Sequence, residues 1–168
     1  LRLSSDFSGP FDFTAGLYYF KDIADIDTDY FIAGQSVTLA QSYRQTRTSY
    51  AAYVDATFEF GPRSTLYGGL RYTSDHGRLK RFEVVPTITL QPTIEYNDAK
   101  PSGRIGLRHK FTSDIMAYAQ YSRGYRSSGF NGGALTSAAD INVARPEFLD
   151  SYEAGIKSQF LDRKLTLN

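Results

Sequence analysis

The sequence predicts an all-β protein, an antiparallel meander of tilted strands of the kind found in transmembrane β-barrels. Apolar and polar residues alternate along several segments, which is typical of strands with two different faces. Short and long connections follow one another between these segments. Aromatic residues make up 15% of the chain and gather at both ends of the apolar faces. We therefore expect about six to eight strands, with one face toward lipid.

The alternation places the strands along the chain. In residues 49–60, every second residue from Tyr50 to Phe60 is uncharged, whereas the opposite face includes Asp55 and Glu59. The same split recurs in other segments and is weakest in residues 115–126. In chain order, the expected strands are residues 11–19, 49–60, 66–75, 104–111, 115–126 and 152–160, with partial strands at 1–5 and 164–168.

The connections between these strands alternate strictly in length. This rhythm indicates a meander of hairpins in which every long loop lies at the same end of the sheet. Outer-membrane barrels are built in this way, with short periplasmic turns and long outer loops. The expected short turns are residues 8–10, 61–64, 112–114 and 162–163, and the expected long polar loops are about 22–46, 76–101 and 127–149.

The aromatic positions favour a membrane barrel over a soluble antiparallel sheet, which would show the same alternation. A soluble sandwich would place its bulkiest side chains at the strand centres, where small or aliphatic residues such as Val54 stand here. Tyr50 and Phe58 are eight residues apart. That is roughly 26 Å along a strand and about 20 Å after a tilt of about 40°. Two aromatic belts at this separation match the interfaces of a bilayer. The belts are Phe11, Phe13, Phe58, Phe60, Phe111 and Phe160 near the short turns, and Tyr19, Tyr50, Tyr72, Tyr121 and Tyr152 near the long loops.

Composition excludes several classes of protein. The chain has no cysteine, so it has neither a disulfide scaffold nor thiolate metal ligands. A net charge of +1 gives no reason to expect a nucleic-acid partner, which usually requires a basic face. No apolar run approaches the roughly 18 residues that a membrane-spanning helix requires. The opening residues 1–5 have no basic or apolar region of a secretory signal.

Few residues offer chemistry. The two histidines, His76 and His109, are expected to be a loop residue and an interfacial residue, not metal ligands. The glycine-rich residues 129–133 do not connect a strand to a helix, so a phosphate cradle is not expected. We predict no catalytic residue, no metal site and no cofactor, and the protein is not expected to be an enzyme. The basic residues 78–81 have two interpretations. In the first, they are a loop surface that contacts water or lipopolysaccharide phosphates. In the second, they attract anionic metal chelates toward the receptor by electrostatic steering.

Several motifs in order resemble the TonB-dependent outer-membrane receptors. Residues 118–131 read YAQYSRGYRSSGFN and resemble that family's aromatic strand leading into a Gly-Phe-Asn loop, although Ser128 stands where a second glycine is common. Residues 145–158 read RPEFLDSYEAGIKS and are similar to the family's Pro-Glu and Tyr-Glu-x-Gly-x-Lys strand. Further similarities lie in residues 1–5, 49–53, 69–75 and 161–168.

The resemblance implies a receptor in the outer membrane of a Gram-negative bacterium that takes up a scarce nutrient. A ferric siderophore is the expected cargo, with vitamins, haem and carbohydrates as alternatives. The implied partners are outer-membrane lipid and lipopolysaccharide, a small ligand such as a metal chelate, and the TonB energy-coupling protein through an N-terminal region. The resemblance also implies that residues 1–168 are an open fragment, a segment of a large transmembrane β-barrel, with the plug domain and the C-terminal strands outside it. We expect ligand contacts at Arg126, Phe130 and Asn131 and in residues 76–100.

Two other interpretations remain at this point. The first is a small self-contained barrel with a structural or adhesive role, which requires the two end strands to pair. The second is a soluble carbohydrate-binding β-sandwich, which requires the aromatic belts to be buried between two sheets.

Overall fold

The computed structural model describes residues 1–31, 38–91, 93–162 and 164–167. Within them the chain is almost entirely β-structure, with a single turn of 3-10 helix, η1 (Ala138–Asp140). No helix among these residues has the length and apolar character needed to cross a membrane. The strands are β1 (Arg2–Ser4), β2 (Phe11–Phe31), β3 (Thr38–Glu59), β4 (Ser64–Val85), β5 (Ile94–Lys110), β6 (Ile115–Arg126), β7 (Gly129–Phe130), β8 (Val143–Ala144), β9 (Glu147–Phe160) and β10 (Leu165–Leu167).

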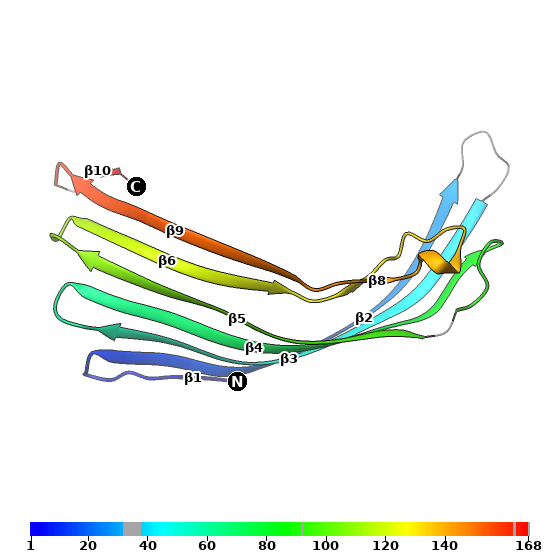
Figure 1. Ribbon diagram of the computed structural model, residues 1–168, viewed down its shortest axis with the longest axis horizontal. Helices are drawn as coiled ribbons and strands as arrows, with labels where there is room; N and C mark the ends of the chain where they lie inside the picture. Colours follow the sequence, from blue (N-terminus) through cyan, green and yellow to red (C-terminus); the bar gives the residue numbers. More distant parts are fainter. Residues whose placement is uncertain (32–37, 92, 163, 168) are drawn as a thin grey trace.

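Eight strands form one curved antiparallel sheet in the order β1-β2-β3-β4-β5-β6-β9-β10. Each strand pairs with its neighbour in the meander, and β7 and β8 form a separate two-stranded ribbon. Strands β1 and β10 occupy opposite edges and do not pair with each other in the described chain, as Figure 1 shows. The predicted fold class, an open all-β meander, is therefore confirmed. Neither a self-closing barrel nor a two-sheet sandwich is present among the described residues.

The short turns all lie at one end of the sheet. They connect β1 to β2, β3 to β4, β5 to β6 and β9 to β10, at the left of Figure 1. The connections between β2 and β3, β4 and β5, and β6 and β9 lie at the other end. This arrangement confirms the predicted rhythm, and we call the two ends the short-turn end and the outer end.

The expected long loops at residues 22–46 and 76–101 are wrong for most of the residues described there; residues 32–37 and 92 lie outside the described part of the chain. Strands β2 and β3 continue in register out to Phe31 and Thr38, and β4 and β5 pair as far as Leu79 and Ile94. Spanning a bilayer takes about 9–11 residues of a tilted strand, whereas β2, β3 and β4 contain 21, 22 and 22 residues. The outer halves are polar because both of their faces leave the bilayer, so the polar sequence mimics a loop.

The expected loop at residues 127–149 contains more structure than the sequence indicated. Strand β9 begins at Glu147, and the preceding segment forms β7, η1 and β8. The side chain of Ser137 caps η1 by accepting a hydrogen bond from the backbone N–H of Ala139 at 3.2 Å. We call residues 127–146 the inner loop, because they fold back over the concave face of the sheet (Figure 1).

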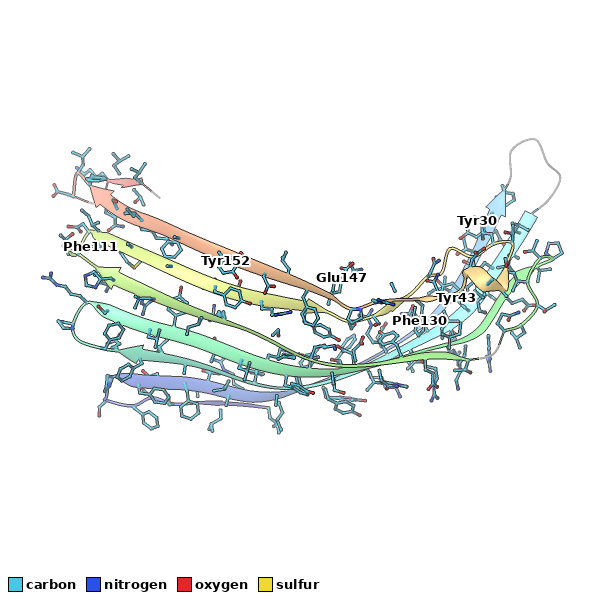
Figure 2. All side chains as sticks on the ribbon, in the orientation of Figure 1. Tyr30, Tyr43, Phe111, Phe130, Glu147 and Tyr152 are labelled. Carbon is cyan, nitrogen blue, oxygen red and sulfur yellow. The ribbon has the colours of Figure 1, made fainter. Side chains whose placement is uncertain are left out.

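The two faces of the sheet differ as predicted. The belt residues Tyr50, Tyr72, Tyr152, Phe58 and Phe160 are all exposed on one face, and no second sheet covers them. The ring of Tyr19 lies beside that of Tyr50, tilted by 42° with ring centroids 5.2 Å apart, and Tyr121 lies beside Tyr152 at 5.0 Å. Figure 2 shows Tyr152 along β9 and Phe111 at the short-turn end. This apolar face is the outward face of a barrel wall.

The register gives the tilt of the strands. One hydrogen-bonded row starts at Phe13, which is 2 residues from the short-turn end of β2, and ends at Tyr152, which is 8 residues from that end of β9. The row climbs about 20 Å over about 24 Å of sheet width, at about 3.4 Å per residue and about 4.8 Å per strand. The tilt is therefore about 40°, within the range of transmembrane barrels. The row consists of Phe13, Ala56, Gly68, Ile105, Tyr121 and Tyr152.

The opposite, inward face is polar. Arg104 of β5 reaches across β4 to the carboxylate of Asp55 in β3, at 2.9 Å. Tyrosine rings lie over glycines directly across from them in the neighbouring strand, because glycine leaves room where any Cβ would meet the ring. These cross-strand pairs are Gly16 with Tyr53, Gly106 with Tyr67, and Gly155 with Tyr118.

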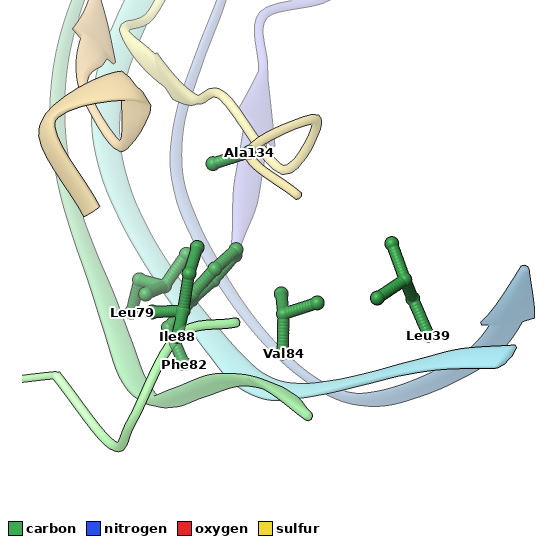
Figure 3. Close-up of a cluster of buried hydrophobic side chains, with 6 residues drawn as sticks. All are labelled: Leu39, Leu79, Phe82, Val84, Ile88 and Ala134. Atoms are coloured by element: carbon green, nitrogen blue, oxygen red, sulfur yellow. The ribbon is translucent and has the colours of Figure 1, made fainter. Parts of the chain in front are cut away.

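A small hydrophobic core lies beyond the belts, at the outer end (Figure 3). Leu79, Phe82 and Val84 of β4 are fully buried there. Arg81 has a positive φ of 56°, and the pairing of β3 with β4 shifts register beside it, between Ser42 and Arg44. The irregularity lets both Leu79 and Phe82 face inward, although they are three residues apart. The core is completed by Leu39, Ile88 and Ala134, with Tyr30, Tyr43, Phe130, Leu135 and Ile141 packed around it.

Candidate functional site

A polar pocket of about 480 Å³ opens beside the inner loop at the outer end of the inward face. This volume lies within the usual range for small-molecule sites, about 300–1,000 Å³. All three residues predicted to contact ligand, Arg126, Phe130 and Asn131, line it. The remaining lining residues are Gln45, Arg47, Tyr96, Ser127, Ser128, Gly129, Asn142, Ala144, Arg145 and Glu147.

Two aromatic rings form the apolar side of this pocket. Phe130 of β7 and Tyr96 of β5 lie with ring centroids 5.1 Å apart, and Phe130 also packs against the outer hydrophobic core. Figure 2 shows Phe130 near Tyr43, between the inner loop and the sheet. Tyr96 is buried over Gly77 in the neighbouring strand, and this burial raises the pKa of its hydroxyl. The rings therefore present a fixed apolar surface.

Asn131 has a structural role in the inner loop. Its Nδ2 donates to the carbonyl of Asp140 at 3.1 Å, and its Oδ1 accepts from the backbone N–H of Gly133 at 3.0 Å. Its own N–H donates to the carbonyl of Asn142 at 3.0 Å. The predicted ligand contact at Asn131 stays a prediction, and any such contact would compete with these bonds.

Three arginines give the pocket a positive charge. Arg47 and Arg145 make no ion pair with another described residue, and Arg126 lies 3.5 Å from Glu147, the one acidic residue of the lining. The side chains of Arg126 and Glu147 are 82% and 71% exposed, so water weakens their mutual attraction. The pocket therefore suits a ligand that carries negative charge.

Hydrogen bonds fix the inner loop to the sheet. Asp98 accepts from the backbone N–H of Ser128 at 2.8 Å. The side-chain amide of Gln41, which is 3% exposed, donates to the carbonyls of Gly132 at 2.9 Å and Ala134 at 3.2 Å. The pocket thus has one wall from β3 and β5 and another from a loop held to that wall.

Tyr125 adjoins this anchoring region. Burial raises the pKa of its hydroxyl, and the nearby carboxylates of Asp75 and Asp98 raise it further. A phenol kept neutral in this way can donate a hydrogen bond at any ordinary pH.

Sequence reasoning alone did not single out Arg47, Arg145 or Tyr96. Arg47 lies beside, and Tyr96 inside, a segment that the sequence predicts to be a long loop, and the contacts predicted for residues 76–100 name no single residue. The useful signal was present: Asp25, Asp27 and Asp29 alternate with Ile26 and Thr28. Such a period of two in a polar segment indicates a strand, and it extends the hairpin that carries Arg47.

Both histidines lie in strands of the sheet. His76 lies within β4, not in a loop as expected, and its Nδ1 is 2.7 Å from Oδ1 of Asn97. His109 packs edge-on against Phe111 at 4.8 Å, and its Nδ1 is 2.8 Å from the Ser64 hydroxyl. No group of three or more potential metal ligands occurs in the described part of the chain.

The comparisons with known proteins agree with this geometry. A sequence profile described as TonB dependent receptor-like, beta-barrel, matches residues 1–168. The chain belongs to this family. Among solved structures, the ferric yersiniabactin uptake receptor FyuA from Yersinia pestis is similar, with a TM-score of 0.81, 21% identity and 95% of this chain covered. The siderophore receptor PiuA from Acinetobacter baumannii is similar as well, with a TM-score of 0.73, 19% identity and 97% covered.

Both similarities concern the fold of the barrel wall. The chain spans about a quarter of each of these receptors, 25% and 28% of their lengths. The curved open sheet is therefore a sector of a TonB-dependent receptor barrel. Its inward face is the lumen side of that barrel, and its aromatic belts mark the two surfaces of the membrane.

Proposed function

We propose that this chain is a wall segment of an outer-membrane receptor that imports an anionic metal chelate, most specifically a ferric siderophore, into a Gram-negative bacterium. The observation that carries the proposal is the pocket beside the inner loop. It combines three arginines with two aromatic rings on the lumen side of the wall, beyond the outer belt. Its role in uptake would be capture of the ligand at the outside of the barrel.

The chemistry of the pocket supports an anionic, partly aromatic ligand. A guanidinium binds carboxylate or other oxyanion groups through paired N–H donors. Tyr96 and Phe130 offer ring faces and edges for apolar or aromatic parts of the same ligand. Gln45 and Asn142 add amide groups that can fix its orientation.

Uptake would require parts of the receptor beyond these residues. The proposal includes a plug domain within the lumen, C-terminal strands that complete the barrel, and a periplasmic TonB protein that supplies energy through an N-terminal region. It also includes lipid and lipopolysaccharide around the outward face. The segment itself contributes the tilted wall, the lumen-facing polar residues and one side of the binding pocket.

The test is ligand binding by the full-length receptor with Arg47→Gln and Arg126→Gln combined. We expect the affinity for its ferric siderophore to fall by about tenfold or more, because each lost charged hydrogen bond contributes about 1.5–3 kcal/mol. Calorimetric titration of the receptor with a panel of ferric chelates measures the change in affinity.

The matched control is Lys110→Gln combined with Lys164→Gln, which removes two cations at the short-turn end. This control should bind with unchanged affinity. If the arginine variant also binds every chelate as the unaltered receptor does, the pocket is not the binding site and the proposed function loses its main support.

A further inference from the structure

The ion pair between Arg126 and Glu147 lies at the base of the inner loop. Arg126 is the last residue of β6 and Glu147 is the first residue of β9, and the two stand directly opposite each other in that ladder. The segment that carries Phe130 and Asn131 runs from one to the other. Because both side chains line the pocket, a ligand that enters it meets the guanidinium and the carboxylate together.

This ion pair is loose. The guanidinium nitrogen and the carboxylate oxygen are 3.5 Å apart, and the side chains are 82% and 71% exposed. A charge-assisted hydrogen bond is about 2.7–2.9 Å long, and Arg104 reaches Asp55 on the same face at 2.9 Å. An ion pair as exposed as that of Arg126 contributes little to stability. Since the ladder fixes both backbones, rotation of the side chains is enough for Arg126 to exchange one carboxylate for another.

Glu147 is the one acidic residue among the described residues that line the pocket. The lining also contains three arginines, of which Arg47 and Arg145 make no ion pair with another described residue. Arg126 is therefore the guanidinium of this pocket that already has a carboxylate beside it. Without a ligand, Glu147 holds the place that an anionic group of the ligand would take.

The opposite role for Glu147 would be to orient Arg126 for ligand binding. A carboxylate that orients a guanidinium forms short, paired hydrogen bonds with it, as Asp25 does with both Nε and Nη2 of Arg44. The separation of 3.5 Å and the high exposure at Arg126 provide no such restraint. The geometry therefore favours competition.

We infer that Glu147 is an internal competitor for Arg126 and so sets how much negative charge a ligand must carry to bind. An anionic chelate has to draw Arg126 away from Glu147 while the same carboxylate repels it. A neutral chelate has no charge with which to replace Glu147 at the guanidinium, so the ion pair persists. This selectivity rests on the proposed function, because it belongs to the same pocket.

The experiment uses the full-length receptor with Glu147→Gln, which removes the charge and keeps the size of the side chain. The probes are two anionic chelates, a ferric tris-catecholate and ferric citrate, and a neutral ferric tris-hydroxamate. We expect the affinity for an anionic chelate that binds, measured by calorimetry, to rise by about two- to fivefold, because one exposed ion pair no longer has to be broken. The affinity for the neutral chelate should not change.

The matched control is Asp150→Asn. Asp150 lies on the same strand, its carboxylate is 3.8 Å from the guanidinium of Arg123, and it does not line the pocket. This variant removes the same charge from β9 and should leave every affinity unchanged. Heat-dependent gel mobility verifies that each variant is a folded barrel.

A measurement without any chelate tests the ion pair itself. Phenylglyoxal modifies accessible guanidinium groups, and mass spectrometry gives the rate of modification at each arginine. Modification of Arg126 should be about two- to fivefold faster in the Glu147→Gln receptor than in the unaltered one. The rate at Arg145, which has no partner to lose, should stay the same.

Three results would overturn the inference. Glu147→Gln could leave unchanged or lower the affinity for the anionic chelates, it could change the affinity for the neutral chelate equally, or it could fail to speed modification of Arg126. Failure of the proposed function has a different signature, since no anionic chelate then binds the unaltered receptor. In that case the rate at Arg126 alone decides whether Glu147 occupies this guanidinium.

Discussion

At the scale of single residues, the packing of tyrosine rings against the inward face depends on glycine. Tyr67 lies over Gly106, Tyr118 over Gly155 and Tyr53 over Gly16, and each pair joins neighbouring strands. The ring shields a strand backbone that a glycine would otherwise leave open. Contacts of this kind contribute to strand pairing. They also keep the lumen side smooth, because the rings lie along the wall.

Replacing Gly106 by alanine should destabilise the barrel. The added methyl group would overlap the Tyr67 ring, which must then move off the wall. We expect the free energy of unfolding of the full-length receptor in lipid or detergent to fall by about 1–3 kcal/mol, the usual cost of overpacking. Gly9→Ala, where nothing lies within 4 Å of the added atom, should have little effect. Equal stability of the Gly106→Ala variant would show that the Tyr67 ring is not held in place.

Residue identity alone predicted part of the candidate site. Arg126, Phe130 and Asn131 could be chosen because they follow an aromatic strand in a recognisable order. Arg47 meets them only through the fold, because β3 lies beside the inner loop after the chain has passed through three further strands of the sheet. A contact between residues so far apart in sequence has no local signature.

At the scale of elements, alternation predicted the membrane-spanning halves of the strands and missed their outer halves. Within the bilayer one face must be apolar, so the pattern of β3 around Val54 is unmistakable. Beyond the belt both faces of a hairpin meet water or polar groups, and the apolar signal disappears. The core of Leu79, Phe82 and Val84 was missed for a related reason, since the irregularity at Arg81 changes the spacing from two to three.

Phe82→Ala should loosen the inner loop. Phe82 is fully buried and its ring stacks on Tyr43 at 5.5 Å, beneath the loop that carries Ala134. Removing a buried phenylalanine ring typically costs about 3–5 kcal/mol, and here the cost falls on the docking of the outer elements. We expect faster amide exchange and faster protease cleavage in residues 132–141, with the membrane-spanning strands unaffected. Phe31→Ala, at a ring that is 82% exposed, is the control. Unchanged exchange in the loop after loss of Phe82 would contradict a cooperative outer core.

At the scale of the whole molecule, the two belts and the tilt place every outward residue at a depth in the membrane. Tyr50 and Phe58 bracket Val54, which therefore lies near the middle of the bilayer. Thr48 is on the same face of the same strand, just beyond the outer belt. The same substitution should thus have different effects at these two positions.

Val54→Lys should lower the unfolding free energy of the receptor in bilayers by about 2–4 kcal/mol, whereas Thr48→Lys should cost about 0–1 kcal/mol. The difference arises because only the first ammonium must enter hydrocarbon. Denaturant titration of receptor reconstituted in lipid vesicles measures both. Equal costs at the two positions would show that the belts do not mark the membrane surfaces.

The long register of β2 with β3 implies a position-dependent resistance to opening. Their ladder runs without a break from Phe11 to Phe31, through the membrane and on into the aqueous layer outside it. In water a broken backbone hydrogen bond is replaced by one to solvent, whereas in hydrocarbon an unpaired amide costs several kcal/mol. The two strands of the hairpin, β2 and β3, can therefore separate from the outer end down to the row of Tyr19 and Tyr50 and no farther. The surface of the bilayer thus sets the limit of such opening, and the part of the hairpin within the bilayer stays paired.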